Sequence, residues 1–202
     1  MEKEVLSADQ DKGQGEFDLG QRQTVLGMKV FLCSESMFFL ALIIAYIYFR
    51  AFSHSWGDVQ RALDWRTAGV FTGFLVLSSL TLTLAVRCFE KAKKAPFVLW
   101  ALATLGLGLA FLIHQMLEYR DLATNSITMD SSIFGSAFYT LTGFHTLHVA
   151  VGMVLLTIVF SLMAKEKLSR PSSGARAVEY YWHFVDVVWV VVYTVVYIGA
   201  VV

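Results

Sequence analysis

Five long apolar stretches alternate with short polar ones along this chain. From this pattern we expect helices at residues 25–49, 67–89, 96–119, 133–163 and 180–202. Each is long enough to cross the roughly 30 Å hydrocarbon core of a bilayer. The fourth is longer than a crossing requires, so we expect it to tilt or to project into the headgroups. The predicted fold class is all-α, an integral membrane bundle of five transmembrane helices.

The composition agrees with a membrane protein. Hydrophobic residues make up 56% of the 202-residue chain and charged residues only 16%, with a mean hydropathy of +0.60. A soluble domain is nearer one-quarter charged. The polar and acidic residues 1–24 are expected to form a mobile cytoplasmic tail at the membrane surface. Cys33 and Cys88 lie within apolar stretches and predict neither a disulfide nor a metal site.

The distribution of lysine and arginine predicts the orientation in the membrane. Twelve of the 16 basic residues lie on one side of the predicted bundle: Lys3, Lys12, Arg22, Lys29, Arg87, Lys91, Lys93, Lys94, Lys165, Lys167, Arg170 and Arg176. The other side has only Arg50, Arg61, Arg66 and Arg120. Since cytoplasmic loops carry the excess of positive charge, we predict the N-terminus inside and the C-terminus outside.

One acidic residue lies well inside the first predicted helix. Glu35 is ten residues into that span, about 15 Å along the helix axis. An unpaired carboxylate at that depth is costly, so we expect it to be protonated or hydrogen-bonded. Two interpretations stay open, a proton-related or lipid-headgroup site and a buried carboxyl that only fastens two helices.

Polar residues within the other spans predict a polar seam between helices. Its members are Gln115, Glu118, His145, His148, His183 and Asp186. His145 and His148 are three positions apart, as are His183 and Asp186, so each pair shares a helix face. Histidines on different helices are what a bis-histidine haem site needs. Hydrogen bonding between helices by neutral imidazole, with Gly143 and Gly152 allowing close approach, is the alternative.

The sequence contains no self-contained catalytic motif. It has no H-E-x-x-H, P-loop or C-x-x-C pattern, and no pair of broken helices of the kind found in transporters. His54 lies in a polar connection and is expected to be solvated. A five-helix bundle with a polar seam and no evident chemistry is typical of a subunit of a larger complex.

Four motifs resemble those of one membrane protein family. Tyr181–Trp189 reads Y-W-H-F-V-D-V-V-W, and Gly143–Val149 matches G-F-H-x-L-H-V. The third helix contains the pattern F-x-x-x-Q-x-x-E-Y from Phe111 to Tyr119, and the first contains S-E-x-x-F-F from Ser34 to Phe39. In this order and helix context, the motifs resemble subunit III of haem–copper terminal oxidases, with cytochrome c oxidase the nearer branch.

The resemblance implies a subunit of an aerobic respiratory oxidase that reduces O2 to water and pumps protons. Such a subunit has no redox centre of its own, and the haems and copper belong to partner subunits. It implies direct contact with subunit I, a complex with subunit II, bound phospholipid, no nucleic-acid partner, and a prokaryotic plasma membrane. It further implies support of proton uptake and of stable turnover. Glu35 then occupies the family's buried acidic position, and the histidine pair is structural.

The chain also departs from the family pattern. The longest members have seven spans, so we expect the first two to be absent here or fused to subunit I. His114 stands where the family usually has an apolar residue, and the sequence offers no account of it. Within the family, a quinol oxidase or nitric oxide reductase subunit is the alternative. Outside it, the alternatives are a haem-b membrane anchor and a proton-coupled carrier.

Overall fold

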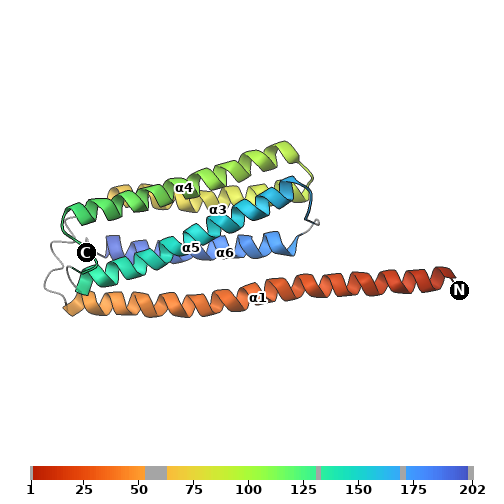
Figure 1. Ribbon diagram of the computed structural model, residues 1–202, viewed down its shortest axis with the longest axis horizontal. Coiled ribbons are helices and arrows are strands. Elements are labelled where there is room, and N and C mark those ends of the chain that lie inside the picture. Colours follow the sequence, from red (N-terminus) through yellow and green to blue (C-terminus); the bar gives the residue numbers. More distant parts are fainter. Residues whose placement is uncertain (1, 53–62, 131–132, 169–171, 200–202) are drawn as a thin grey trace.

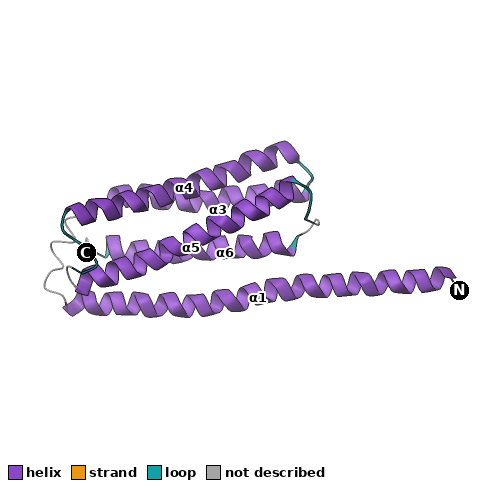
Figure 2. Ribbon diagram, viewed as in Figure 1, coloured by secondary structure: helices purple, strands orange, loops and turns teal. Residues whose placement is uncertain are grey.

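The structure is a computed structural model that describes residues 2–52, 63–130, 133–168 and 172–199. At residues 2–18 and at Phe134 it describes the backbone alone. These described segments consist of helices and short connections, without a strand (Figure 2). Five of the described helices are long and apolar enough to cross a membrane, as predicted. His54, Trp56 and Arg61, in the predicted first loop, lie outside the described residues.

The helices are named as in Figure 1. Their bounds are α1 (Glu2–Phe52), α3 (Trp65–Glu90), α4 (Lys94–Thr124), α5 (Ile133–Ala164) and α6 (Ser173–Tyr193), the last followed by the π-helical turn η1 (Thr194–Ile198). Two differences from the sequence pattern stand out. Helix α6 begins seven residues earlier than position 180, and a π-helical turn follows it, for which the sequence carried no signal.

Helix α1 continues through the segment expected to be a polar tail. It runs back to Glu2 and projects well beyond the other helices at its N-terminal end (Figure 1). The stretch 2–24 contains no proline and includes several Glu, Lys, Gln and Leu residues, which have good helix propensity. The apolar part of this long helix is Leu19–Phe52.

Helix α6 occupies the centre of the bundle. It packs against α1, α5 and α3, while α4 packs against α3 and α5. Figure 1 shows α1 lying along one side of this group and α4 along the other. Helix α1 therefore meets the bundle mainly through α5 and α6. Its large apolar side chains are mostly exposed, including Val30, Met37, Leu40 and Ile44.

Two tryptophans and a tyrosine join α6 to its neighbours. The Trp182 indole is completely buried, and its Nε1 donates to Ser78 Oγ of α3 at 2.9 Å. Trp189 Nε1 donates to Thr72 Oγ1 of the same helix at 2.9 Å, and Tyr181 donates to the His148 carbonyl of α5 at 3.0 Å. A buried indole or phenol needs such a partner, so these bonds set the rotation of α6.

Two glycines make room for the Trp182 ring. A Cβ on Gly152 of α5 would lie 2.8 Å from Trp182 Cε3, and one on Gly108 of α4 would lie 3.1 Å from Trp182 Cη2. Trp182 thereby packs directly on the backbones of two other helices. Small residues at such contacts let transmembrane helices approach closely.

Side chains also close the ends of several helices. Asp64 caps α3 by accepting from the backbone N–H groups of Arg66 and Thr67, and Ser172 caps α6 by accepting from the Ala175 N–H. The Thr67 hydroxyl and N–H bonds hold the pKa of the exposed Asp64 carboxyl below its usual value. At the other end of α6, the Arg50 guanidinium of α1 donates to the Val195 and Gly199 carbonyls, a favourable place for a cation.

The contact between Gly152 and Trp182 gives a stability prediction. Gly152→Ala places a methyl group against a buried ring that has no free space to move into. We expect a loss of about 1–3 kcal/mol in unfolding free energy, as for other overpacked cores. Gly106→Ala on α4 is the matched control, because nothing lies within 4 Å of its added Cβ. It should be neutral or stabilising.

Thermal unfolding of both variants in detergent, followed by circular dichroism, measures the difference. An unchanged unfolding midpoint for Gly152→Ala would show that the α5–α6 contact is looser than described.

Candidate functional site

The polar residues predicted from the sequence fall into separate places rather than one continuous seam. Glu35 meets His148 between α1 and α5, and Gln115 meets Glu118 near the C-terminal end of α4. His183 and Asp186 lie together on α6, where both contact α3. His145 is enclosed among aromatic rings. Each place therefore has its own chemistry.

Glu35 and His148 form a pair that joins α1 to α5. Glu35 Oε2 lies 3.2 Å from His148 Nε2, and the two side chains are 21% and 16% exposed. His148 Nδ1 lies 2.7 Å from the Phe144 carbonyl oxygen. Since a carbonyl only accepts, Nδ1 must carry a hydrogen.

This tautomer leaves a single shared proton between the two side chains. Either the Glu35 carboxyl is protonated and donates to a neutral imidazole, or an imidazolium donates to the carboxylate. The pair has no net charge in both forms, which suits its place inside a membrane. The buried Phe39 ring packs against His148, with centroids 5.0 Å apart.

His145 is one turn away from His148 and has different surroundings. Its imidazole is fully buried and stacks on Trp189, with centroids 4.7 Å apart and planes 29° apart. Phe111 and Phe39 meet it edge-on. Neither ring nitrogen has a hydrogen-bond partner among the described residues. His145 therefore acts in this structure as part of an aromatic cluster.

Gln115 and Glu118 form a hydrogen-bonded group with a residue that the sequence did not single out. Gln115 Nε2 donates to Glu118 Oε2 at 3.1 Å, and the Tyr197 hydroxyl donates to the same oxygen at 2.7 Å. Tyr197 is fully buried and belongs to η1. This group joins α4 to the end of the last span.

His183 and Asp186 are linked through Ser79 of α3. The Ser79 hydroxyl donates to Asp186 Oδ2, so its oxygen is left to accept from His183 Nδ1, 2.9 Å away. His183 Nε2 lies 3.3 Å from Thr83 Oγ1 and 3.8 Å from Glu179 Oε1. The sequence predicted that His183 and Asp186 share a face. It could not identify Ser79, which lies 107 positions from Asp186.

The intramembrane histidines of the described residues have separate partners. His114, for which the sequence offered no role, stacks on Phe71 of α3 with centroids 4.0 Å apart. Among the described residues no group of three or more His, Cys, Asp or Glu side chains could hold a metal ion. The arrangement thus offers hydrogen bonding between helices and one shared proton.

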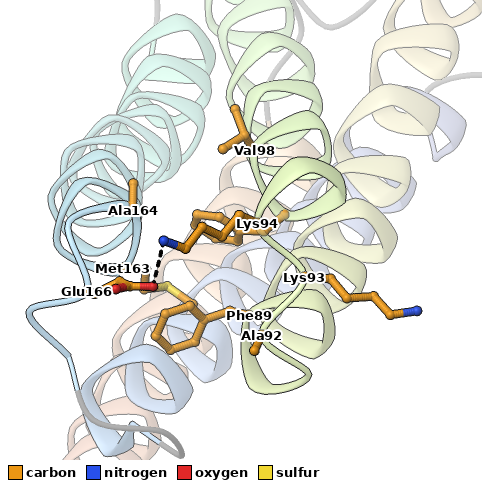
Figure 3. A pocket seen from close by; sticks show the side chains of 9 residues that line it. Phe89, Ala92, Lys93, Lys94, Val98, Met163, Ala164 and Glu166 are labelled. Carbon is orange, nitrogen blue, oxygen red and sulfur yellow. Dashed lines mark ion pairs between the residues drawn. The ribbon is translucent and has the colours of Figure 1, made fainter.

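A small cavity lies where the α3–α4 turn meets the end of α5 (Figure 3). Its volume is about 110 Å³, and Phe89, Phe97 and Met163 form its apolar wall. Figure 3 shows Lys94 extending to Glu166 at the rim, where Nζ and Oε1 are 2.9 Å apart. Such an exposed ion pair contributes little stability. The cavity is also smaller than ordinary small-molecule sites.

Comparison with known proteins gives consistent matches. The family model described as "Cytochrome c oxidase subunit III" matches residues 9–201. "Cytochrome c oxidase subunit 3" of Corynebacterium diphtheriae is 36% identical over 176 residues, which cover 85% of this chain and 86% of the relative. "Probable cytochrome c oxidase subunit 3" of Mycobacterium leprae is 36% identical over 173 residues, with coverage of 85% and 86%. "Cytochrome c oxidase subunit 3" of Synechocystis sp. is 35% identical over 177 residues, covering 86% of this chain and 75% of the relative.

The Tyr197 hydroxyl gives the prediction for this part of the molecule. Tyr197→Phe removes a donor from the largely buried Glu118 carboxyl, so we expect a loss of about 1–3 kcal/mol in unfolding free energy. Tyr193→Phe is the matched control. Its ring stacks on Tyr197, but its hydroxyl donates to the exposed Trp65 carbonyl.

Chemical unfolding in detergent, monitored by tryptophan fluorescence, measures both losses. We expect Tyr193→Phe to lose clearly less unfolding free energy, because water can replace the lost hydrogen bond to the Trp65 carbonyl. Equal losses of unfolding free energy would mean that the hydrogen bond to Glu118 stabilises the fold no more than the exposed bond of Tyr193 does.

Proposed function

This chain belongs to the cytochrome c oxidase subunit III family, and we propose that it acts as an accessory subunit III of an aerobic respiratory cytochrome c oxidase. The match along residues 9–201 is the observation that carries the proposal. In this role the chain has no redox centre of its own. Haem and copper belong to partner subunits, where O2 is reduced to water and protons are pumped.

Most of the polar side chains inside the predicted spans hold the helices of this chain together, which supports an accessory role. Gln115, Glu118 and His183 hydrogen-bond within or between helices of this chain. The expected partners are subunit I in direct contact, subunit II within the complex, and membrane phospholipids. The expected location is a prokaryotic plasma membrane, crossed five times with the N-terminus in the cytoplasm.

The Glu35–His148 pair is the group proposed to serve proton uptake or lipid binding. It is the one place in the described spans where a carboxyl and an imidazole contact directly at hydrogen-bond distance. Both side chains are still partly exposed. The pair is neutral while it holds this proton, and release of the proton leaves one negative charge, so release within the membrane has to be matched by uptake of another proton.

The subunit composition of the complex decides between this proposal and its alternatives. Purification in mild detergent through a tag on this chain is expected to recover a large haem-bearing subunit and a copper-bearing one. A parallel purification through a tagged membrane protein unrelated to respiration is the control. The haem spectrum and partner masses separate a cytochrome c oxidase from a quinol oxidase or nitric oxide reductase.

Other results would contradict the proposal. A Soret band from the isolated chain would favour the haem-b anchor. A colourless chain recovered alone from intact membranes, together with uptake activity in liposomes, would favour the carrier.

The role of Glu35 can be tested with two substitutions. Glu35→Ala removes the partner of His148, whereas Glu35→Gln keeps a donor to His148 Nε2 but cannot exchange a proton. We expect both variants to assemble with the partner subunits. Both should lower sustained turnover severalfold while the initial rate stays close to wild type, because the shared proton is lost in each.

Oxygen consumption followed to inactivation, normalised to haem content, measures this effect. Normal sustained turnover in Glu35→Gln would assign the effect to the hydrogen bond alone. Loss of the complex from membranes of both variants would make Glu35 a structural contact.

A further inference from the structure

A row of polar side chains follows the contact between α3 and α6, from the beginning of α6 to its middle. Its members are Arg176, Glu179, His183 and Asp186 of α6 and Glu90, Thr83 and Ser79 of α3. Arg176 Nη2 lies 3.5 Å from Glu90 Oε1, and His183 Nε2 lies 3.3 Å from Thr83 Oγ1. The Ser79 hydroxyl donates to Asp186. Polar groups on the two helices therefore meet along this whole part of their contact.

The row connects one end of the last span with its middle. The span Ser173–Ile198 has 26 residues, and Glu179 and Asp186 follow Ser173 by 6 and 13 positions. At 1.5 Å per residue, they lie about 9 Å and about 20 Å along a helix of about 39 Å. Lipid acyl chains offer no hydrogen bond at the depth of Asp186. Because Asp186 is 5% exposed, neighbouring side chains are its connection to the membrane surface.

His183 and Ser79 link Asp186 to Glu179. The oxygen of Ser79, whose hydrogen goes to Asp186 Oδ2, accepts from His183 Nδ1 at 2.9 Å. His183 Nε2 lies 3.8 Å from Glu179 Oε1, so a proton transfer there needs a side-chain rotation or one bridging water. The side chains of His183 and Glu179 are 39% and 19% exposed. This end of the link is therefore accessible, whereas the Asp186 end is buried.

The imidazole and the hydroxyl can pass a proton along because each both donates and accepts. When a proton binds to His183 Nε2, the Nδ1 proton moves to Ser79 Oγ, and the Ser79 hydroxyl proton moves to Asp186 Oδ2. The imidazole ends neutral with its hydrogen on Nε2, and the carboxylate becomes a neutral carboxyl. That carboxyl then donates to Ser79, and Ser79 donates to Nδ1. Both hydrogen bonds are kept with their directions reversed.

Thr83 fits both ends of this transfer. Its hydroxyl oxygen lies 3.3 Å from His183 Nε2. A hydroxyl can donate to an Nε2 without hydrogen and accept from an Nε2 that carries one. The environment of Nε2 thus allows either tautomer of His183.

We propose that His183, Ser79 and Asp186 form a relay that takes up one proton at His183, beside Glu179, and holds it on Asp186 in the middle of the membrane. The ligand is a proton from water at the membrane surface where α6 begins. Uptake neutralises a buried carboxylate, which is costly to keep ionised at this depth. The relay is separate from the Glu35–His148 pair, which lies between α1 and α5.

The charged groups of the row lie at the entry of the relay. Two are basic and two acidic when Arg87, one turn beyond Thr83 on α3, is included: Arg87, Arg176, Glu90 and Glu179. On the other helices packed against α6, Lys29 of α1 lies over the Tyr180 ring, and Glu35 of α1 pairs with His148 of α5. Among the described residues, the titratable side chain linked to Asp186 is therefore His183.

Infrared difference spectroscopy tests the end of the relay. The tagged full-length chain is used in the assembly with which it purifies, and the pH is lowered in one step. We expect a carbonyl stretching band from a newly protonated carboxyl that Asp186→Asn abolishes. Glu118→Gln, which removes another carboxyl hydrogen-bonded inside the bundle, is the control and should keep this band. A band set unchanged by Asp186→Asn would overturn the proposal.

The rate of protonation tests the link through Ser79. Ser79→Ala leaves both ends in place but removes the hydroxyl between them, so the Asp186 band should appear about tenfold more slowly or worse. Ser161→Ala is the matched control, because its hydroxyl donates to the Thr157 carbonyl on α5, away from the relay. Equal rates in both variants would exclude Ser79 from the path and overturn the relay.

Nitrogen NMR of the wild-type chain gives a result that does not depend on whether a variant folds. His183 is the one histidine followed by phenylalanine in the sequence, so labelling this pair identifies its signal. We expect its ring hydrogen on Nδ1 at high pH and on Nε2 at low pH. A ring that keeps the Nδ1 hydrogen at every pH, or that becomes an imidazolium beside an ionised Asp186, would overturn the proposal.

The relay and the proposed function fail independently. The relay consists of side chains of this chain alone, so its failure would leave the accessory role unaffected. If the tagged chain recovers no haem-bearing subunit, the accessory role is wrong, and the infrared and NMR results still decide the relay.

Discussion

The close packing of Trp182 is the contact on which the arrangement of the helices depends. Four helices meet at this ring: α6 supplies it, Ser78 of α3 accepts its N–H, and the backbones of α4 and α5 lie against it at Gly108 and Gly152. Lipid chains are as apolar as the side chains between these helices, so burial alone cannot hold them together. Close contact and hydrogen bonds supply the missing attraction.

Hydrogen bonds between polar side chains hold the other helix pairs together for the same reason. Thr81 and Thr104 join α3 to α4 at 2.8 Å, Trp189 joins α6 to α3, and Tyr197 joins η1 to α4. The remaining polar side chains differ in how completely they are paired. Glu35 and His148 pair between α1 and α5, whereas Asp186 Oδ1, Gln115 Oε1 and both ring nitrogens of His145 are buried without a hydrogen-bond partner among the described residues.

Much of the fold could be predicted because it follows from local patterns. The length of each apolar stretch predicts a spanning helix, and the four motifs led to the family that the comparisons confirm. The spacing of His183 and Asp186 places both on one face, and both contact Ser79. The sequence did not predict that Ser79 contacts Asp186 or that Tyr197 contacts Glu118. A serine or tyrosine in an apolar helix gives no sign of whether a carboxyl group lies opposite it. The extension of α1 was not expected because residues 2–24 lack an apolar stretch, and the π-helical turn lacked a local signal.

The class of protein, the five spans and the family could all be read from the amino-acid sequence. Those properties depend on hydrophobic length and on residues close together along the chain. The packing of the helices then settled that His145 stacks on Trp189 while His148, one turn away, meets Glu35. It also decided that one oxygen of Asp186 has a hydrogen-bond partner among the described residues and the other has none. The physical reason is that a hydrogen bond between helices depends on their relative rotation and height. These are set by contacts such as Trp182 on Gly108 and Gly152, which join residues far apart in the sequence.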